Sequence, residues 1–182
     1  MFADLPNSVE IREVGPRDGL QNETTIPVNE RIALIDALSA TGLTAIEAAS
    51  FVHPKAIPPM AGSAEVMKGI CRVPGVRYRA LVPNERGALD ALACDADELE
   101  VVMSISETHN RKNINMTPDE SVKQIIELTA LAHQEETPVE AILSTAFGCA
   151  YEGDISPTRV AYYARRVLDE GGVDALSFGD TS

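Results

Sequence analysis

Two patterns of hydrophobic and polar positions alternate along the chain. Short runs of β-branched and other apolar residues are typical of strands, and longer stretches with apolar residues every three to four positions are typical of helices. The predicted strands cover residues 9–14, 44–49, 76–82, 98–104, 138–143 and 173–178. The predicted helices cover residues 28–40, 61–71, 85–94, 117–134 and 157–170.

Local signals at the helix starts support this division. Thr117, Pro118 and Glu120 form the sequence of a capping box, with the proline at the first helical position. Asn84 is a suitable N-cap for the helix that follows it, and Ser156 precedes another proline. The sequence therefore predicts about six strands and five helices in alternation.

This alternation is typical of an α/β fold with a parallel sheet and right-handed crossovers. Both an open doubly wound sheet and a TIM-type (β/α) barrel fit the pattern. No G-x-G-x-x-G segment follows the first strand, which weakens the dinucleotide-binding form of the open sheet. A complete barrel needs eight strands and about 250 residues, so the barrel alternative is incomplete. In that case we expect open edges at the first and sixth strands and an exposed, apolar barrel interior.

Composition and charge narrow the class of protein. The 182 residues include 15 Lys and Arg against 28 Asp and Glu, and the net charge of −13 argues against a nucleic-acid partner. No apolar run approaches the ~20 residues of a membrane span, and the first residues do not resemble a signal peptide. Three widely spaced cysteines are typical of free thiols in a reducing compartment. We therefore expect one domain over residues 1–182, cytoplasmic and without a membrane partner.

Polar side chains follow the predicted strands at the points where those strands end. In a parallel sheet all these ends share one edge, which is the active edge of barrel enzymes. Solvent exposure alone also makes such segments polar, so the pattern leaves both interpretations open. In chain order the candidates are Arg17, Asp18, Glu47, Arg111, Lys112, Asn113 and Asp180.

The segment Gly15-Pro16-Arg17-Asp18-Gly19 places two opposite charges on a predicted tight turn. An Asp carboxylate is a hard oxygen ligand for a divalent ion, and an Arg stays charged and stabilises a developing oxyanion. An exposed Arg–Asp pair that only stabilises the turn fits the same spacing.

Five segments in collinear order carry a family resemblance. They cover residues 14–23, 45–52, 106–115, 147–153 and 177–181, and the first of them reads VGPRDGLQNE. Together they resemble 3-hydroxy-3-methylglutaryl-CoA lyases, members of the metal-dependent aldol/Claisen TIM-barrel group that includes the isopropylmalate, homocitrate and citramalate synthases. The Gly-Leu-Gln-Asn-Glu ending of the first segment favours a lyase over a synthase, because the synthases usually continue with Gly-Glu-Gln.

The resemblance implies a reaction and a set of roles. The substrate would be 3-hydroxy-3-methylglutaryl-CoA, cleaved to acetyl-CoA and acetoacetate with a Mg²⁺ or Mn²⁺ ion as Lewis acid. By motif, Asp18 would be a metal ligand, and Arg17 would bind substrate and stabilise the enolate oxygen. Glu47 and Asp180 would support proton transfer. We also expect a homo-oligomer. The residues assigned to the CoA portion, in a predicted loop, are Arg111, Lys112 and Asn113.

The chain departs from the family after its sixth predicted strand. The resemblance implies two further strands, which supply a His-x-His pair and an Asn as metal ligands and a Gly-rich segment with a catalytic Cys. His53, His109 and His133 lack that spacing, and Cys149 follows the fifth strand, so we interpret Cys149 as structural. Three hypotheses remain. The chain is part of a lyase, weakly active or inactive alone; it is a synthase that condenses a 2-oxo acid with acetyl-CoA; or it is a non-catalytic partial-barrel binding protein.

Overall fold

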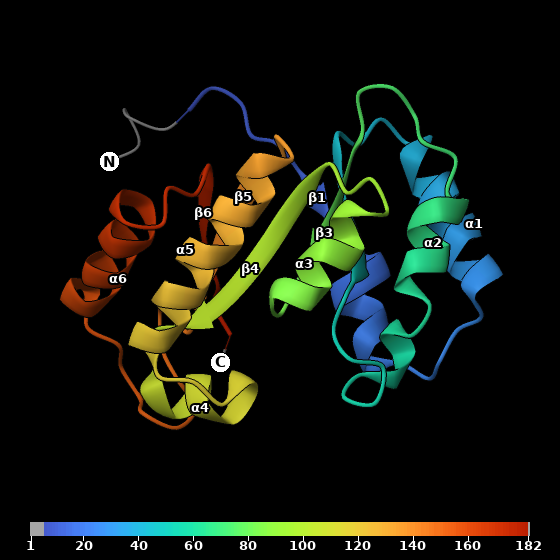
Figure 1. Ribbon diagram of the computed structural model, residues 1–182. Helices are drawn as coiled ribbons and strands as arrows, with labels where there is room; N and C mark the ends of the chain where they lie inside the picture. Colours follow the sequence, from blue (N-terminus) through green and yellow to red (C-terminus); the bar gives the residue numbers. More distant parts are fainter. Residues whose placement is uncertain (1–5, 182) are drawn as a thin grey trace.

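The computed structural model describes residues 6–181 and has a curved parallel sheet at its centre (Figure 1). Each strand within that range pairs with the next one in sequence, in the order β1-β2-β3-β4-β5-β6. A doubly wound sheet would require the order to reverse, so the open-sheet alternative is excluded and the incomplete TIM-type barrel is confirmed. The strands are β1 Arg12–Glu13, β2 Ala45–Ser50, β3 Arg77–Leu81, β4 Glu98–Ser104, β5 Val139–Ser144 and β6 Ala175–Phe178.

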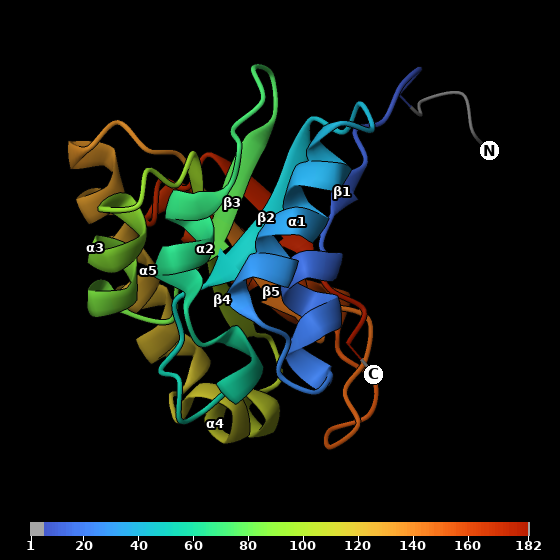
Figure 2. The same cartoon turned by 90° about the vertical axis from the view of Figure 1, so that its right-hand side faces the viewer.

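Helices cover the outer side of this sheet, and one helix, α4, lies across its lower end (Figures 1 and 2). Five of the helices correspond to the predicted ones, whereas α4 occupies a segment that we expected to be a loop. Within residues 6–181 no helix is both long and apolar enough to cross a membrane. The helices are α1 Val28–Ser39, α2 Ser63–Gly69, α3 Glu85–Leu92, α4 Glu107–Ile114, α5 Pro118–Gln134 and α6 Pro157–Asp169.

The helix starts follow the predicted capping chemistry. The Thr117 hydroxyl accepts a hydrogen bond from the Glu120 amide, and the Glu120 carboxylate accepts one from the Thr117 amide at 2.7 Å, which completes the capping box of α5. The Asn84 side chain accepts from the Gly87 amide at 3.0 Å at the start of α3. These side chains satisfy amide groups that have no partner within the helix itself.

The first strand is shorter than predicted. Only Arg12 and Glu13 pair with β2, opposite Ala45 and Ile46. The segment before them is exposed, with Val9 and Ile11 more than two-thirds accessible. Residues 9–11 therefore satisfy the strand pattern in sequence without pairing with β2.

The apolar core lies between the sheet and the helices. Leu99, Val101 and Met103 of β4 point toward this outer layer and are buried in it. The alternate positions, Glu98 and Glu100, point inward, because successive side chains of a strand face opposite sides. Buried charge on the inner side corrects the expectation of an apolar barrel interior.

Candidate active site

Arg17 is positioned by the turn that follows β1. The amides of Arg17, Asp18 and Gly19 all donate to the Val14 carbonyl, at 3.1, 2.7 and 3.5 Å, and form a π-helical turn, η1 (Gly15–Gly19). This turn directs the Arg17 side chain toward β2, where its Nε donates to Glu47 Oε1 at 2.5 Å.

The Arg17–Glu47 pair is largely removed from solvent. Glu47 on β2 is 1% exposed, and the Arg17 side chain is 12% exposed. Burial alone would lower the pKa of Arg17, but the hydrogen bond and the negative charge of Glu47 outweigh it and raise that pKa above its ordinary value. Arg17 therefore stays protonated, and its guanidinium group is held in one orientation at the edge of the sheet.

Asp18 extends this pair toward solvent. Its Oδ1 accepts hydrogen bonds from Arg17 Nη1 and from Gln21 Nε2, both at 2.8 Å, and its side chain is 53% exposed. Arg17 therefore bridges Asp18 and the buried Glu47. An Arg–Asp pair that only stabilises a turn accounts for the Asp18 contact and leaves the Glu47 contact unexplained.

Asp180 lies at the same edge of the sheet, directly after β6. The preceding Gly179 amide donates to the Leu143 carbonyl at 2.9 Å, and Thr181 Oγ1 accepts from the Thr145 amide at 3.0 Å. These two hydrogen bonds hold the segment around Asp180 against the end of β5. Asp180 itself is exposed, and within residues 6–181 no hydrogen bond or ion pair joins it to Arg17.

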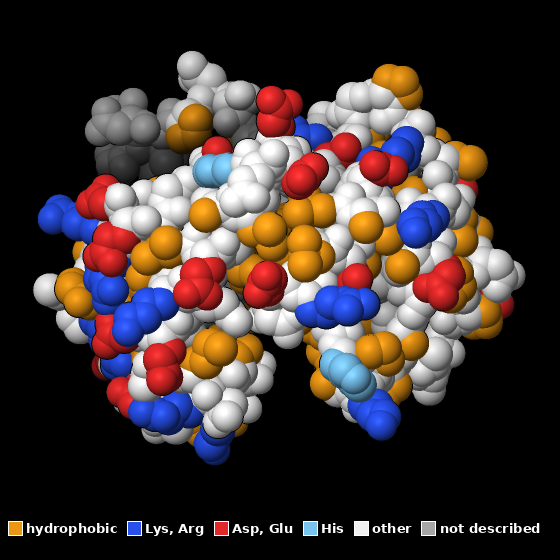
Figure 3. All heavy atoms as spheres, viewed as in Figure 1, with side chains coloured by type: hydrophobic (Ala, Val, Ile, Leu, Met, Phe, Trp, Pro, Cys, Tyr) orange, Lys and Arg blue, Asp and Glu red, His pale blue; other side chains and the backbone are white. Residues whose placement is uncertain are grey.

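The three predicted CoA contacts lie on the last turns of α4, not in a loop. Arg111, Lys112 and Asn113 are all exposed. Arg111 pairs with Glu107 one turn earlier at 2.9 Å, and Lys112 Nζ lies 3.8 Å from the centre of the Tyr151 ring. Figure 3 shows that the molecular surface is hollowed next to α4, at the edge where the strands end.

Asn110 explains why α4 forms where the sequence pattern predicts none. This fully buried side chain accepts from the Ser104 amide at 2.8 Å and donates to the Met116 carbonyl and to Ser121 Oγ. It therefore ties α4 to β4 and to α5. A lone buried Asn in a polar segment gives no helical periodicity, so only the tertiary contacts identify it.

Cys149 is buried in the segment between β5 and α6. Its thiol donates to Ser106 Oγ at 3.0 Å, and its sulfur accepts a hydrogen bond from the Tyr151 amide. Burial raises the pKa of this thiol, but the contacts with Ser106 and the neighbouring amides outweigh it and lower the pKa. The thiol joins this segment to the start of α4, as a structural residue does.

The described residues do not by themselves form a metal site. No group of three or more His, Cys, Asp and Glu side chains that could hold an ion occurs among residues 6–181. His133 is held by Asp174 at 2.9 Å, and His109 Nδ1 contacts Ser104 Oγ at 2.7 Å. Asp18 supplies one exposed carboxylate of the kind that Mg²⁺ or Mn²⁺ prefers, which fits a single ligand of such an ion.

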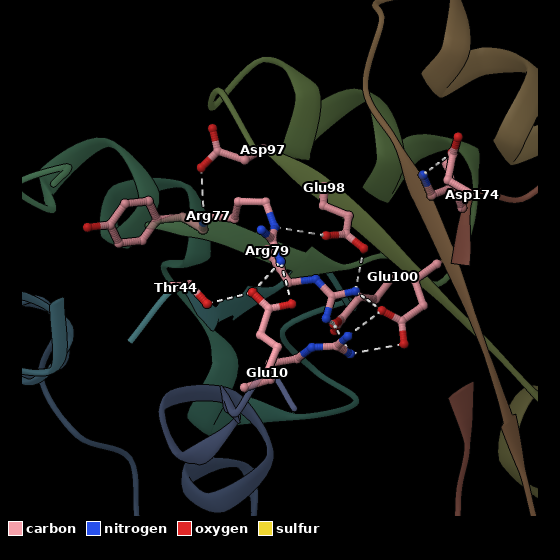
Figure 4. Close-up of polar contacts among 12 residues, drawn as sticks. Glu10, Thr44, Arg77, Arg79, Asp97, Glu98, Glu100 and Asp174 are labelled. Atoms are coloured by element: carbon pink, nitrogen blue, oxygen red, sulfur yellow. Dashed lines mark hydrogen bonds and ion pairs between the residues drawn. The ribbon is translucent and has the colours of Figure 1, made fainter. Parts of the chain in front are cut away.

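The sequence interpretation missed a buried charge cluster on the inner side of the sheet. Figure 4 shows Arg79 of β3 between Glu98 and Glu100 of β4, and Arg79 is fully buried. Strand register places Arg79 opposite both Glu47 and Glu98, and Glu100 opposite Glu140. The sequence signal for this cluster was a pair of acidic residues, Glu98 and Glu100, two positions apart in the otherwise apolar strand β4.

Comparison of the sequence with known proteins identifies the family to which the chain is similar. A family model described as HMGL-like matches residues 8–182. A hydroxymethylglutaryl-CoA lyase of Bacillus subtilis is 48% identical over 177 residues, which are 97% of this chain and 59% of that protein. A cytoplasmic 3-hydroxy-3-methylglutaryl-CoA lyase of Danio rerio is 48% identical over 178 residues, which are 53% of that protein.

Solved structures show the same relation. The HMG-CoA lyase of Bacillus subtilis superposes with a TM-score of 0.94, over 97% of this chain and 59% of the other. An HMG-CoA lyase of Acinetobacter baumannii, in complex with coenzyme A and 3-methylmalate, superposes with a TM-score of 0.91 at 40% identity, over 95% of this chain and 56% of the other. The chain thus spans little more than half the length of the relatives it matches. With the family match over nearly its whole length, the chain belongs to the HMGL-like family.

Proposed function

We propose that residues 1–182 form the N-terminal part of a lyase barrel domain that cleaves 3-hydroxy-3-methylglutaryl-CoA to acetyl-CoA and acetoacetate. The observation that carries this proposal is the Arg17–Glu47 pair, which fixes a buried positive charge at the carboxyl edge of the sheet. The similarity to lyases of this compound supports the substrate class.

The roles of the side chains follow from the bonds that change. A base removes the proton of the tertiary hydroxyl, the carbon–carbon bond breaks, and its electron pair forms the enolate of acetyl-CoA, which is then protonated. Arg17 stabilises the negative oxygen of that enolate, because its charge is permanent and its direction is set by Glu47. Glu47 and Asp180 support the proton transfers.

A divalent ion would complete the site. Asp18 would hold Mg²⁺ or Mn²⁺, which when bound supplies Lewis-acid polarisation of the substrate oxygens. The exposure of Asp18, and the absence within residues 6–181 of any group of three or more His, Cys, Asp and Glu side chains that could hold an ion, support a site completed by groups from outside this segment.

The exposed end of α4 would bind the CoA portion of the substrate. Phosphate groups of an acyl-CoA are anionic, and Arg111 and Lys112 place two cations on one turn of an otherwise acidic protein, beside the amide of Asn113. We further propose a homo-oligomer, which the open sheet edges support, and a cytoplasmic location, which the three free cysteines support.

The test measures acetoacetate released from 3-hydroxy-3-methylglutaryl-CoA by the native protein with Mg²⁺ or Mn²⁺. We expect Arg17→Gln to lower kcat by roughly 10²–10³-fold, the usual effect of removing an oxyanion donor. The matched control is Arg86→Gln, which changes an exposed arginine on α3 whose only ion pair among residues 6–181 is with Asp90. Equal turnover by the Arg17→Gln variant and the unmodified protein would contradict the proposal. Consumption of a 2-oxo acid with release of free CoA would indicate the synthase instead.

A further inference from the structure

Glu100 lies at the centre of the buried charge cluster and has no role in the proposed reaction. It is on the inner face of β4, and its side chain is completely buried. Charged groups face it from every neighbouring strand: Arg12 of β1, Glu47 of β2, Arg79 of β3, Glu140 of β5 and, on its own strand, Glu98, with Arg17 beyond Glu47.

The arginines of the cluster are bound mainly to other carboxylates. Arg79 Nη2 donates to Glu98 at 2.6 Å and also to Glu140, and Arg12 donates to Glu140 at 2.9 Å. Arg79 Nη1 lies 2.7 Å from Glu100 Oε1, but outside the direction of a hydrogen bond. Within residues 6–181, neither oxygen of Glu100 accepts an aligned hydrogen bond from an N–H or O–H donor.

Negative charge is therefore in excess around Glu100. Three arginines, Arg12, Arg17 and Arg79, face four carboxyl groups. Arg77 lies 3.7 Å from Glu98, but it is half-exposed and bound through two hydrogen bonds to Glu10. An ionised, unpaired carboxylate at this depth would be costly, so one group must take up a proton. The four carboxyl groups are Glu47, Glu98, Glu100 and Glu140.

The surroundings of Glu100 identify that group. Glu47, Glu98 and Glu140 each accept a hydrogen bond from an arginine, whereas within residues 6–181 both oxygens of Glu100 lack such a donor. Glu47 also opposes the ionisation of Glu100, and two neighbouring carboxyl groups can share a hydrogen bond only if one of them carries a proton. We propose that Glu100 is a carboxylic acid that donates its proton to Glu47 and so keeps Glu47 directed at Arg17. Glu100 is then a positioning residue for Arg17. Its importance for catalysis rests on the proposed function, whereas the location of the proton does not.

The two acids at the centre of the cluster differ in the direction of their pKa shifts. Burial, together with the neighbouring Glu47, raises the pKa of Glu100 to about 9. Burial also acts on Glu140, but the hydrogen bonds from Arg12 and Ser177 and the charge of Arg79 outweigh it and lower that pKa. The neutral Glu100 on β4 and the ionised Glu140 on β5 are therefore opposite each other on adjacent strands.

The proton is tested by ¹³C NMR of the native protein with labelled glutamate side chains. At pH 7 we expect one carboxyl carbon with the chemical shift of a protonated acid, which titrates with a pKa of about 9. The signal should be missing in Glu100→Gln and retained in Glu127→Gln, which changes an exposed residue of α5. Glutamates that are all ionised at pH 7, or a signal that persists in Glu100→Gln, would overturn the proposal.

The positioning role is tested on the Nε–H group of Arg17 by ¹⁵N NMR. Gln at position 100 still offers an N–H donor to Glu47, whereas Met offers none. We expect Glu100→Gln to keep the exchange rate of the Arg17 Nε–H proton, and Glu100→Met to raise it at least tenfold. A folded Glu100→Met variant with an unchanged Arg17 signal would refute the role. Neither measurement needs turnover, so an inactive protein would contradict the proposed function and leave this inference standing.

Discussion

On the inner side of the sheet, burial and neighbouring arginines have opposite effects on the pKa of individual glutamates. Glu100 and Glu140 are neighbours across β4 and β5, and both are removed from water. Arginine contacts reverse the effect of burial at Glu140 and do not reverse it at Glu100. Two chemically identical residues therefore hold different protonation states because of which partners reach them.

This difference predicts an unusual dependence of stability on pH. In the unfolded chain Glu100 ionises near the ordinary glutamate pKa of 4.5, whereas the folded chain holds the proton until about pH 9. Because the folded state binds more protons in that window, stability falls as pH rises from 4.5 to 9 and is level above it. Gln at position 100 has no proton to take up. We expect Glu100→Gln to raise the free energy of unfolding at pH 7 by about 1–3 kcal/mol.

Urea unfolding at several pH values checks this prediction, with Glu127→Gln as the control. The difference between Glu100→Gln and the unmodified protein should widen between pH 5 and pH 9. A difference that stays constant over this range would show that Glu100 ionises normally in the folded protein.

The sequence could identify Arg17, Asp18 and Glu47 because each lies beside a strand end in a recognisable motif. The structure brings Arg17 into contact with both acids, while their catalytic and metal-binding roles stay predictions. Glu100 could not be identified in this way, because its state depends on side chains from several strands. Those contacts exist only after the strands have been brought into register.

Among the secondary-structure elements, α4 depends most on tertiary contacts. Its sequence has no apolar stripe, yet its start is capped by Ser106, which accepts from the His109 amide at 3.1 Å. Asn110 then anchors it to β4 and to α5. The helix carries the side chains proposed to bind CoA, so its anchoring affects their position.

We expect Asn110→Ala to lower the free energy of unfolding by about 2–4 kcal/mol, because it leaves the buried Ser104 amide without a partner and removes two further hydrogen bonds. Asn113→Ala, on the exposed side of the same helix, should change it by less than about 0.5 kcal/mol. Thermal and urea unfolding of both variants provide the measurement. Equal losses of stability in the two variants would contradict the anchoring role of Asn110.

The predicted helices were found because their signals are local. Thr117 with Glu120, and Asn84 with the following turn, specify helix starts without reference to the rest of the chain. The first strand was predicted too long because its apolar residues, Val9 and Ile11, satisfy the strand pattern. Only Arg12 and Glu13 pair with β2, so the apolar pattern before them does not correspond to strand pairing within residues 6–181.

Residues 6–181 as a whole form an unclosed barrel. Over the described residues, β1 and β6 each have one side without a paired strand. Phe178, at the end of β6, is 46% exposed, and such edges favour association with another chain. On the inner side of the sheet, in contrast, Arg79, Glu100 and Glu140 are buried.

Association through the β6 edge predicts an effect of charge at that edge. We expect Phe178→Lys to weaken self-association of the 182-residue chain at least tenfold, because a lysine at an open edge opposes strand pairing. Leu89→Lys changes a similarly exposed residue on α3 and should have little effect. Sedimentation velocity over a range of concentrations measures both. A Phe178→Lys variant that associates as strongly as the unmodified chain would place the contact elsewhere.

At this scale the hydrophobic pattern predicted the number of strands and helices and left the strand order open, whereas the family resemblance indicated the incomplete barrel that the structure confirms. Alternating strands and helices occur equally in doubly wound sheets and barrels, so the pattern could not distinguish the two. The distinction depends on strand order, which is a property of how distant segments pair. The polarity of the interior was also missed, because the partners of Arg79 and Glu100 come from other strands.

We propose that these residues supply the N-terminal half of a working lyase site. The most direct test fuses residues 1–182 to the C-terminal part of the Bacillus subtilis relative and measures acetoacetate release from 3-hydroxy-3-methylglutaryl-CoA with Mn²⁺ and with EDTA. The account predicts metal-dependent cleavage by the fusion, at least 100-fold faster than by the 182-residue chain alone, because the fusion supplies the missing ligands. A folded fusion that releases no acetoacetate in the presence of Mn²⁺ would contradict it.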